Sequence, residues 1–235
     1  MAMPTFVALL ILSFLFPVPS TGAHEDIGIS RIQFESLSQF ASALPNDIQL
    51  LDDAIAIEGF LEALDGYPPD WPAVYGRGHH DPGHDDRLFQ VNRERDERRV
   101  GNLALARRIA FRWSGELSRF DPAKKGFSVA LGPVFTSTRW GQVRFKTDDL
   151  PGELKAIPSA DSLDRLLCEI AAGKTVELAV IIIGRLIPDE SIMYDFSHDQ
   201  DGLGLIMPVV RVEEVLYVLS PSLHNDPSLV IPSPH

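Results

Sequence analysis

The feature that most constrains the fold is the order of apolar patterns in the second half of the chain. Three extended segments come first, one amphipathic helix follows, and further extended segments end the region. The helix is expected over 159–173, because Ser159 can cap its start and Gly173 can end it. The expected strands are 109–117, 127–131, 142–147 and 175–187, with a last strand or pair of strands over 203–207 and 209–219.

This order resembles the connectivity of the OB-fold, a small five-stranded Greek-key barrel. The resemblance is topological and covers residues 107–219, with Gly115 as the expected bend or bulge inside the first strand. It implies an α+β protein in which N-terminal helices pack on a five-stranded OB-like β-barrel, with one helix between strands three and four. A rolled sheet of another β-barrel class is the competing interpretation.

The preceding segment, residues 24–106, is expected to form a helical N-terminal region. Apolar residues at a spacing of three to four predict two amphipathic helices, and a polar helix with a thin apolar stripe follows. Asn46 or Asp47 can cap the second helix, and the Pro/Gly-rich residues 67–86 are expected to form a loop. The expected helices cover 32–44, 48–64 and 87–108.

The first 23 residues carry no charged side chain and contain a 13-residue apolar run. Small residues before position 24 complete the pattern of a signal peptide cleaved after Ala23, which predicts a periplasmic or secreted protein. An uncleaved anchor is the alternative, although the run is shorter than the roughly 20 residues that span a bilayer. The lone cysteine, Cys168, fits an oxidising compartment and is expected to be a buried thiol. The proline-rich tail, 220–235, is expected to lie loose.

Charge divides the mature chain into three blocks. Residues 24–86 carry a net charge of −11, residues 87–147 carry +9, and residues 148–235 carry −10. The basic middle block is either an anion-binding surface or is neutralised internally by its acidic flanks. The formal net charge of the whole chain is −12, which favours internal neutralisation.

Basic and aromatic side chains gather where an OB-type barrel binds its ligands, on strands two and three and the neighbouring loops. Such a composition suits a polyanion with stackable rings, but export argues for a peptide, a glycan or a protein partner rather than nucleic acid. The alternative is that the rings of an alternating strand belong to the core. The candidate ligand-binding residues are Arg139, Trp140, Arg144, Phe145, Lys146, Lys124 and Lys125.

The densest set of metal-ligand side chains lies in the Pro/Gly-rich segment. His79, His80, His84 and Asp85 have the chemistry to bind a divalent metal such as Zn²⁺, and no other cofactor is expected. The alternative is a solvated linker, because a loop loses conformational entropy when it forms such a site. The sequence DFSHDQDG, residues 195–202, lacks the glutamate that would complete a calcium loop, so we expect a hairpin there.

No nucleophile elbow, Walker loop or dinucleotide fingerprint occurs in the sequence. The sequence therefore favours an exported, non-enzymatic binding or envelope-associated module that recognises a peptide, glycan or protein partner. The alternative is a metal-dependent enzyme or metal-binding protein that uses the cluster at 79–86.

Overall fold

The computed structural model describes residues 27–77, 81–197 and 202–219. The expected signal peptide, residues 1–23, and the C-terminal tail, residues 220–235, lie outside the described residues. Within the described part, none of the helices is both long and apolar enough to cross a membrane.

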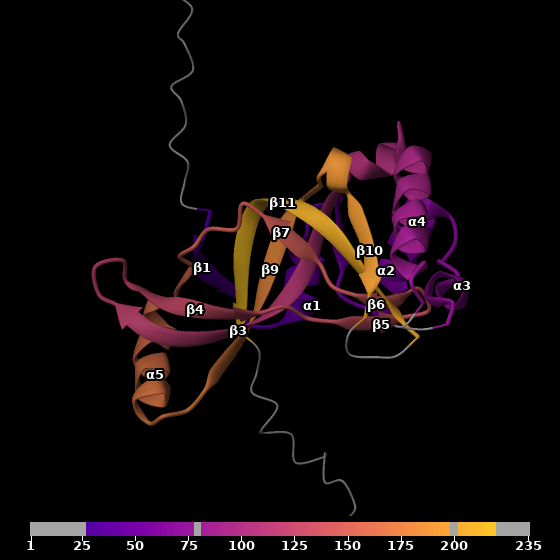
Figure 1. The fold of residues 1–235 in the computed structure, drawn as a ribbon. Coiled ribbons are helices and arrows are strands. Elements are labelled where there is room, and N and C mark those ends of the chain that lie inside the picture. Colours follow the sequence, from indigo (N-terminus) through magenta and orange to yellow (C-terminus); the bar gives the residue numbers. More distant parts are fainter. Residues whose placement is uncertain (1–26, 78–80, 198–201, 220–235) are drawn as a thin grey trace, which may run out of the picture.

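Six strands close into a mixed β-barrel (Figure 1). Their order around the barrel is β1-β8-β4-β3-β9-β11, and β11 closes the circuit by pairing with β1. The β3 strand is antiparallel to β4 and β9, whereas β1 is parallel to both of its neighbours. The barrel strands are β1 (Ile29–Phe34), β8 (Lys155–Ile157), β4 (Gly126–Gly132), β3 (Arg108–Asp121), β9 (Val176–Leu186) and β11 (Gly204–Leu219).

The expected α+β class and β-barrel are confirmed, and the barrel is compatible with a resemblance to the OB-fold. Helix α5 (Ala160–Ala171) follows β8 and precedes β9, and Ser159 caps it as expected. The barrel has six strands rather than five, so the expected strand count is wrong.

The difference lies at the expected third strand, residues 142–147. This segment forms β6 (Gly141–Val143) and β7 (Lys146–Asp148), which both pair with β11 outside the six-strand circuit. In the barrel wall its place is taken by β8 and β1. The β1 strand comes from a segment where a helix was expected, because six residues are too few to separate the two apolar periods.

Successive side chains of the barrel strands point to opposite faces of the sheet, and each face has its own apolar core. Phe111, Trp113 and Leu117 of β3 point into the barrel, where they join Phe127 of β4. Between them, side chains such as that of Ala110 point outward into a second cluster. Helix α1 (Leu37–Ala43) covers this second cluster through Phe40.

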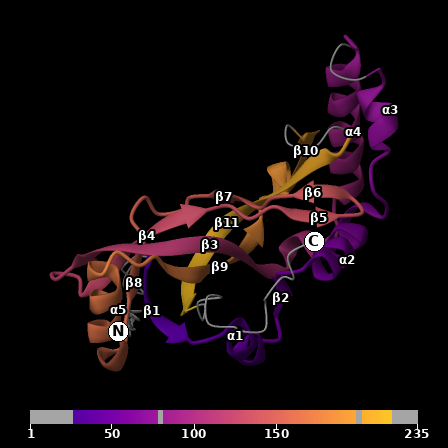
Figure 2. The same cartoon turned by 90° about the horizontal axis from the view of Figure 1, so that it is seen from below.

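The remaining elements form a second region at one end of the molecule, which we call the helical lobe and define as residues 54–77, 81–99, 136–143, 192–197 and 202–208. Figure 2 shows the barrel and α5 toward one end, the lobe at the other, and β11 running through both. The lobe contains α2 (Ala54–Asp65), α3 (Trp71–Tyr75), α4 (His84–Arg99), β5 (Thr136–Thr138), β6 and β10 (Ile192–Phe196).

Three expectations for the N-terminal half are wrong in detail. Residues 48–64 contain strand β2 (Ile48–Leu51) before α2, which is capped by Asp53 and not by Asn46 or Asp47. The expected loop contains α3 and the first residues of α4. The expected polar helix ends at Arg99, and the 3₁₀ helix η1 (Leu103–Ala106) follows it and precedes β3. A second 3₁₀ helix, η2 (Pro188–Glu190), lies between β9 and β10.

Candidate functional site

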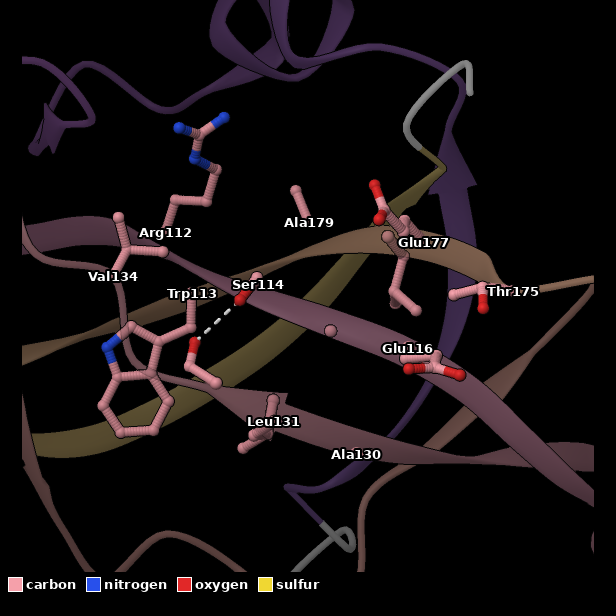
Figure 3. Close-up of a pocket in the computed structure, with 13 residues that line it drawn as sticks. Arg112, Trp113, Ser114, Glu116, Ala130, Leu131, Val134, Thr175, Glu177 and Ala179 are labelled. Carbon is pink, nitrogen blue, oxygen red and sulfur yellow. Dashed lines mark hydrogen bonds between the residues drawn. The ribbon is translucent and has the colours of Figure 1, made fainter. Parts of the chain in front are cut away.

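A hollow with a volume of about 500 Å³ lies on the outer face of β3, β4 and β9 (Figure 3). Its floor follows the outward-facing residues of β3, which alternate with the residues that point into the barrel core. These outward-facing residues are Arg112, Ser114 and Glu116.

Small side chains line the centre of this face of the sheet, so little projects above the strands there. Ser114 lies opposite Gly132 on β4 and opposite Ala179 on β9. Glu116 is flanked on the β4 side by Ala130. The Ser114 hydroxyl donates a hydrogen bond to the Gly132 carbonyl at 3.0 Å, which holds it flat against the sheet. The strands therefore leave space above their centre instead of filling it with long side chains.

The two ends of the hollow carry opposite charges. The half-buried Arg112 lies at one end, and Glu116 lies directly opposite Glu177 at the other end, beside Thr175 (Figure 3). In the ranges that the structure describes, no ion pair joins Arg112, Glu116 or Glu177 to another side chain. Like charges directly opposite on neighbouring strands destabilise a sheet. The glutamate pair therefore does not serve the stability of the barrel, and its two exposed carboxylates have the chemistry to accept a cationic group.

Comparison with protein-family models, with curated proteins and with solved structures found no match for this chain.

The ligand-binding residues expected from the sequence lie elsewhere, and their rings are in the core. Trp140 is fully buried, and Phe145 is buried in a stacked contact with Phe111 at 4.5 Å between ring centroids. A ligand cannot stack on rings that solvent does not reach, so for these two residues the alternative interpretation as core residues holds. Lys146 is exposed, and Arg144 lies over the Phe135 ring at 5.7 Å.

The other basic candidates are engaged or distant. Arg139 forms ion pairs with Glu58 and Glu62 of α2, at 3.0 and 2.9 Å. Lys124 pairs with Glu153 at 2.8 Å, and the exposed Lys125 follows it in the turn between β3 and β4. That turn lies far from β5 and β6 in Figure 1, so the structure does not bring the seven candidates into one surface.

The metal-binding cluster is only partly within the described chain, because His79 and His80 lie outside it. The His84 ring stacks on Phe196 at 4.7 Å between centroids, and its Nε2 lies 3.4 Å from a carboxylate oxygen of Asp85. Among the residues that are described, no group of three or more histidine, cysteine, aspartate or glutamate side chains could hold a metal ion. Metal binding at 79–86 stays a prediction.

Two further expectations can be compared with the structure. Cys168 is exposed on α5, because the helix buries Leu166 on its other face, so the expected buried thiol is wrong. The strands that flank the expected hairpin at 195–202 pair antiparallel, with Phe196 in β10 opposite Gly204 in β11, and residues 198–201 of its loop lie outside the described residues.

Much of the basic middle block is neutralised by the acidic flanks. Its most buried pair joins Arg99 to Asp65 through hydrogen bonds of 2.6 and 2.7 Å. Although burial opposes it, the contact with Asp65 raises the pKa of Arg99. At the surface, Arg108 pairs with Asp47 and Glu213 at 3.1 and 2.9 Å. These contacts join the three charge blocks and leave Arg112 as a basic group that faces an open hollow.

Proposed function

We propose that this protein is an exported, non-catalytic binding module that recognises a peptide through the hollow over β3, β4 and β9. The observation that carries the proposal is the open hollow with Arg112 at one end and the Glu116–Glu177 pair at the other. A volume of about 500 Å³ falls within the range of ordinary small-ligand sites.

The charges of the hollow favour a peptide over the other partner classes. A neutral glycan offers no charge to either end, and the one aromatic residue among those that line the hollow, Trp113, is buried. A nucleic acid would meet Glu116 and Glu177, which repel phosphates. A peptide brings ammonium and carboxylate groups on one flexible chain, so it can satisfy both ends.

Export is supported by the signal-peptide pattern of residues 1–23 and by the single cysteine. N-terminal sequencing of protein purified from its own compartment should begin at His24. Recovery of the chain with Met1 intact would contradict the export part of the proposal and leave the peptide site to be tested separately.

Peptide binding can be tested with an equimolar library of synthetic tetrapeptides that carry free termini. The library is passed over the immobilised protein, and the retained peptides are identified by mass spectrometry. We expect a reproducible subset to be retained, and we expect Ala130→Trp to reduce retention at least tenfold, because the exposed Ala130 lines the hollow and an indole there would fill it.

The matched control is Glu94→Trp, which places the same side chain on the exposed surface of α4 in the lobe. This variant should retain the same peptides as the unchanged protein. Two results would overturn the proposed function. In the first, Ala130→Trp retains peptides as well as the unchanged protein does. In the second, the unchanged protein retains no more peptide than Ala130→Trp does.

A further inference from the structure

We infer that the hollow binds a short peptide in one direction, with the N-terminal ammonium between Glu116 and Glu177 and the C-terminal carboxylate at Arg112. The inference rests on the proposed function, because it names the ligand class and orientation of the same site. It goes further by requiring both peptide ends to be free.

The ammonium end is set by the register of two strands. Glu116 and Glu177 are directly opposite, so their Cβ atoms lie roughly 5 Å apart and both side chains leave the same face of the sheet. An ammonium group has three donors and no acceptor, which lets it bridge two carboxylates. Such a group would also remove the repulsion between the two glutamates, and both remain exposed to meet it.

The carboxylate end is set by Arg112. A guanidinium presents a planar set of donors that binds a carboxylate through two parallel hydrogen bonds. Arg112 is half-buried beside the hollow, and it forms no ion pair within the described ranges, so its charge is available. The glutamate end would repel a carboxylate, which fixes the direction of the ligand.

The separation of the two ends sets the length of the ligand. Arg112 and Glu116 are four residues apart on one strand, which corresponds to about 13 Å between their Cα atoms. An extended peptide of three residues spans about 10 Å, and the long side chains at both ends close the remaining distance. A single amino acid holds its two charges too close together to contact both ends.

The middle of the hollow accepts a backbone with small side chains. Ser114 lies there with Gly132 and Ala179 on either side, so no long side chain blocks the path between the charged ends. The Ser114 hydroxyl donates to Gly132, which leaves its lone pairs free to accept from a ligand amide.

Trialanine tests the inference, because either charge can be removed without changing its length. Isothermal titration calorimetry at low salt would compare trialanine with N-acetyl-trialanine and with trialanine amide. We expect both blocked peptides to bind at least tenfold more weakly than trialanine, since each loses a charge-assisted contact.

Two variants assign the charges to the two ends. Arg112→Gln should remove the difference between trialanine and its amide, while N-acetylation should still weaken binding. The double variant Glu116→Gln, Glu177→Gln should show the reverse pattern. Each variant keeps its sensitivity to one end, which separates a lost contact from a misfolded protein. Arg119→Gln, an exposed charge of β3 outside the hollow, should change neither difference.

The outcomes separate this inference from the proposed function. Equal binding of the free and blocked tripeptides would overturn the inferred direction of the ligand and leave the peptide-binding module intact. The inferred length would be overturned if trialanine failed to bind while tetrapeptides were still retained in a manner sensitive to Ala130→Trp, and this result too would leave the module intact. Loss of all retention above the Ala130→Trp level overturns both.

Discussion

The barrel and the helical lobe are stabilised in different ways. The barrel interior is built from apolar side chains, such as Phe127 and Val180, whose burial depends on strand alternation. The buried hydroxyl of Tyr217 donates to the carbonyl of Gly28 at 2.8 Å, and burial raises the pKa of this tyrosine. The lobe instead surrounds a group of buried charges. Apolar packing tolerates single changes better than a charge network, so the two regions should respond differently to mutation.

The centre of the lobe is Asp65, whose side chain is fully buried at the end of α2. It pairs with Arg99 through two hydrogen bonds and with Arg95 at 3.4 Å, both from α4. The Tyr194 hydroxyl of β10 also donates to Asp65, and burial raises the pKa of this tyrosine. One carboxylate therefore joins two helices and a strand.

Helix α4 also completes the open edge of β10. The Asn92 side chain donates to the Tyr194 carbonyl and accepts from the Tyr194 amide, both at 2.8 Å. A carboxamide here takes the place of a neighbouring strand, which satisfies the edge and protects it from pairing with another chain.

The largest expected effect is that of Asp65→Ala. It leaves Arg95 and Arg99 buried without their shared counter-charge, which should cost about 3–5 kcal/mol of unfolding free energy. Urea unfolding measures this loss. The control Glu62→Ala, on the same helix but exposed, should cost less than about 1 kcal/mol. Equal losses for the two variants would contradict the view that the lobe depends on its buried charges.

The next effect compares a glycine from each region. A Cβ on Gly204 would lie 1.9 Å from Cζ2 of Trp71, whose indole is held by a hydrogen bond of 2.6 Å to the Trp140 carbonyl. Gly204→Ala should therefore destabilise the lobe by about 1–3 kcal/mol. In the barrel, a Cβ on Gly115 would lie 2.6 Å from Cγ2 of Val180, which is a milder conflict. Gly115→Ala should cost less, and the reverse order in thermal unfolding would show that the lobe adapts more readily than the barrel.

An effect of similar size is expected at the edge of β10. Asn92→Ala removes both partners of the Tyr194 backbone, which should cost about 1–3 kcal/mol. Asn92→Asp keeps the acceptor and loses the donor, so its cost should lie between that of Asn92→Ala and zero. Amide exchange at Tyr194, followed by NMR, should accelerate in the same order. Unchanged exchange in Asn92→Ala would show that the strand edge does not need this side chain.

The same contrast explains how far the sequence could be interpreted. The strands β3, β4 and β9 and the helix α5 carry their signals locally, in apolar alternation, β-branched residues and the Ser159 cap. The strands β5, β7 and β8 have three residues each, which is too short to show any period. The lobe was missed because its contacts join residues far apart in the chain, as Asp65 and Tyr194 do.

Pro208 illustrates a second limit. A proline lacks the backbone N–H that a central strand uses, and the sequence left open whether residues 203–207 and 209–219 form one strand or two. The structure shows one strand, β11, that changes partners near this point, from β10 and β6 before it to β7 and β9 after it. The missing donor falls where one set of pairings gives way to the next.

The candidate site was half visible in the sequence. Arg112, Ser114 and Glu116 alternate along one expected strand, so their common face could be predicted. Their partner Glu177 lies on a strand about 60 residues later, and only the register of β3 with β9 places it opposite Glu116. The aromatic residues near residue 140 were predicted to bind a ligand, because buried rings and ligand-stacking rings have the same sequence pattern.

The smallest expected effect is an acid dependence of the lobe that depends on one carboxylate, Asp81. Asp81 accepts hydrogen bonds from the amides of Arg77 and Gly83 and pairs with Arg87, and these contacts lower its pKa from 3.8 to about 2. Because the folded-state pKa lies below the unfolded one, the stabilisation is fully present above about pH 4 and is lost as the pH falls toward 2. The difference in urea midpoint between the unchanged protein and Asp81→Asn should therefore shrink over this interval, with Asp164→Asn, an exposed position of α5, as the control. In the barrel, contacts with Lys155 lower the pKa of Asp121, and contacts with Lys124 and Lys155 lower that of Glu153, so these carboxylates also lose their contribution in acid. The same contacts raise the pKa of Lys155, so the contribution of this lysine is lost only at alkaline pH. A constant difference for Asp81→Asn from pH 5 to 2 would mean that the start of α4 does not depend on this carboxylate.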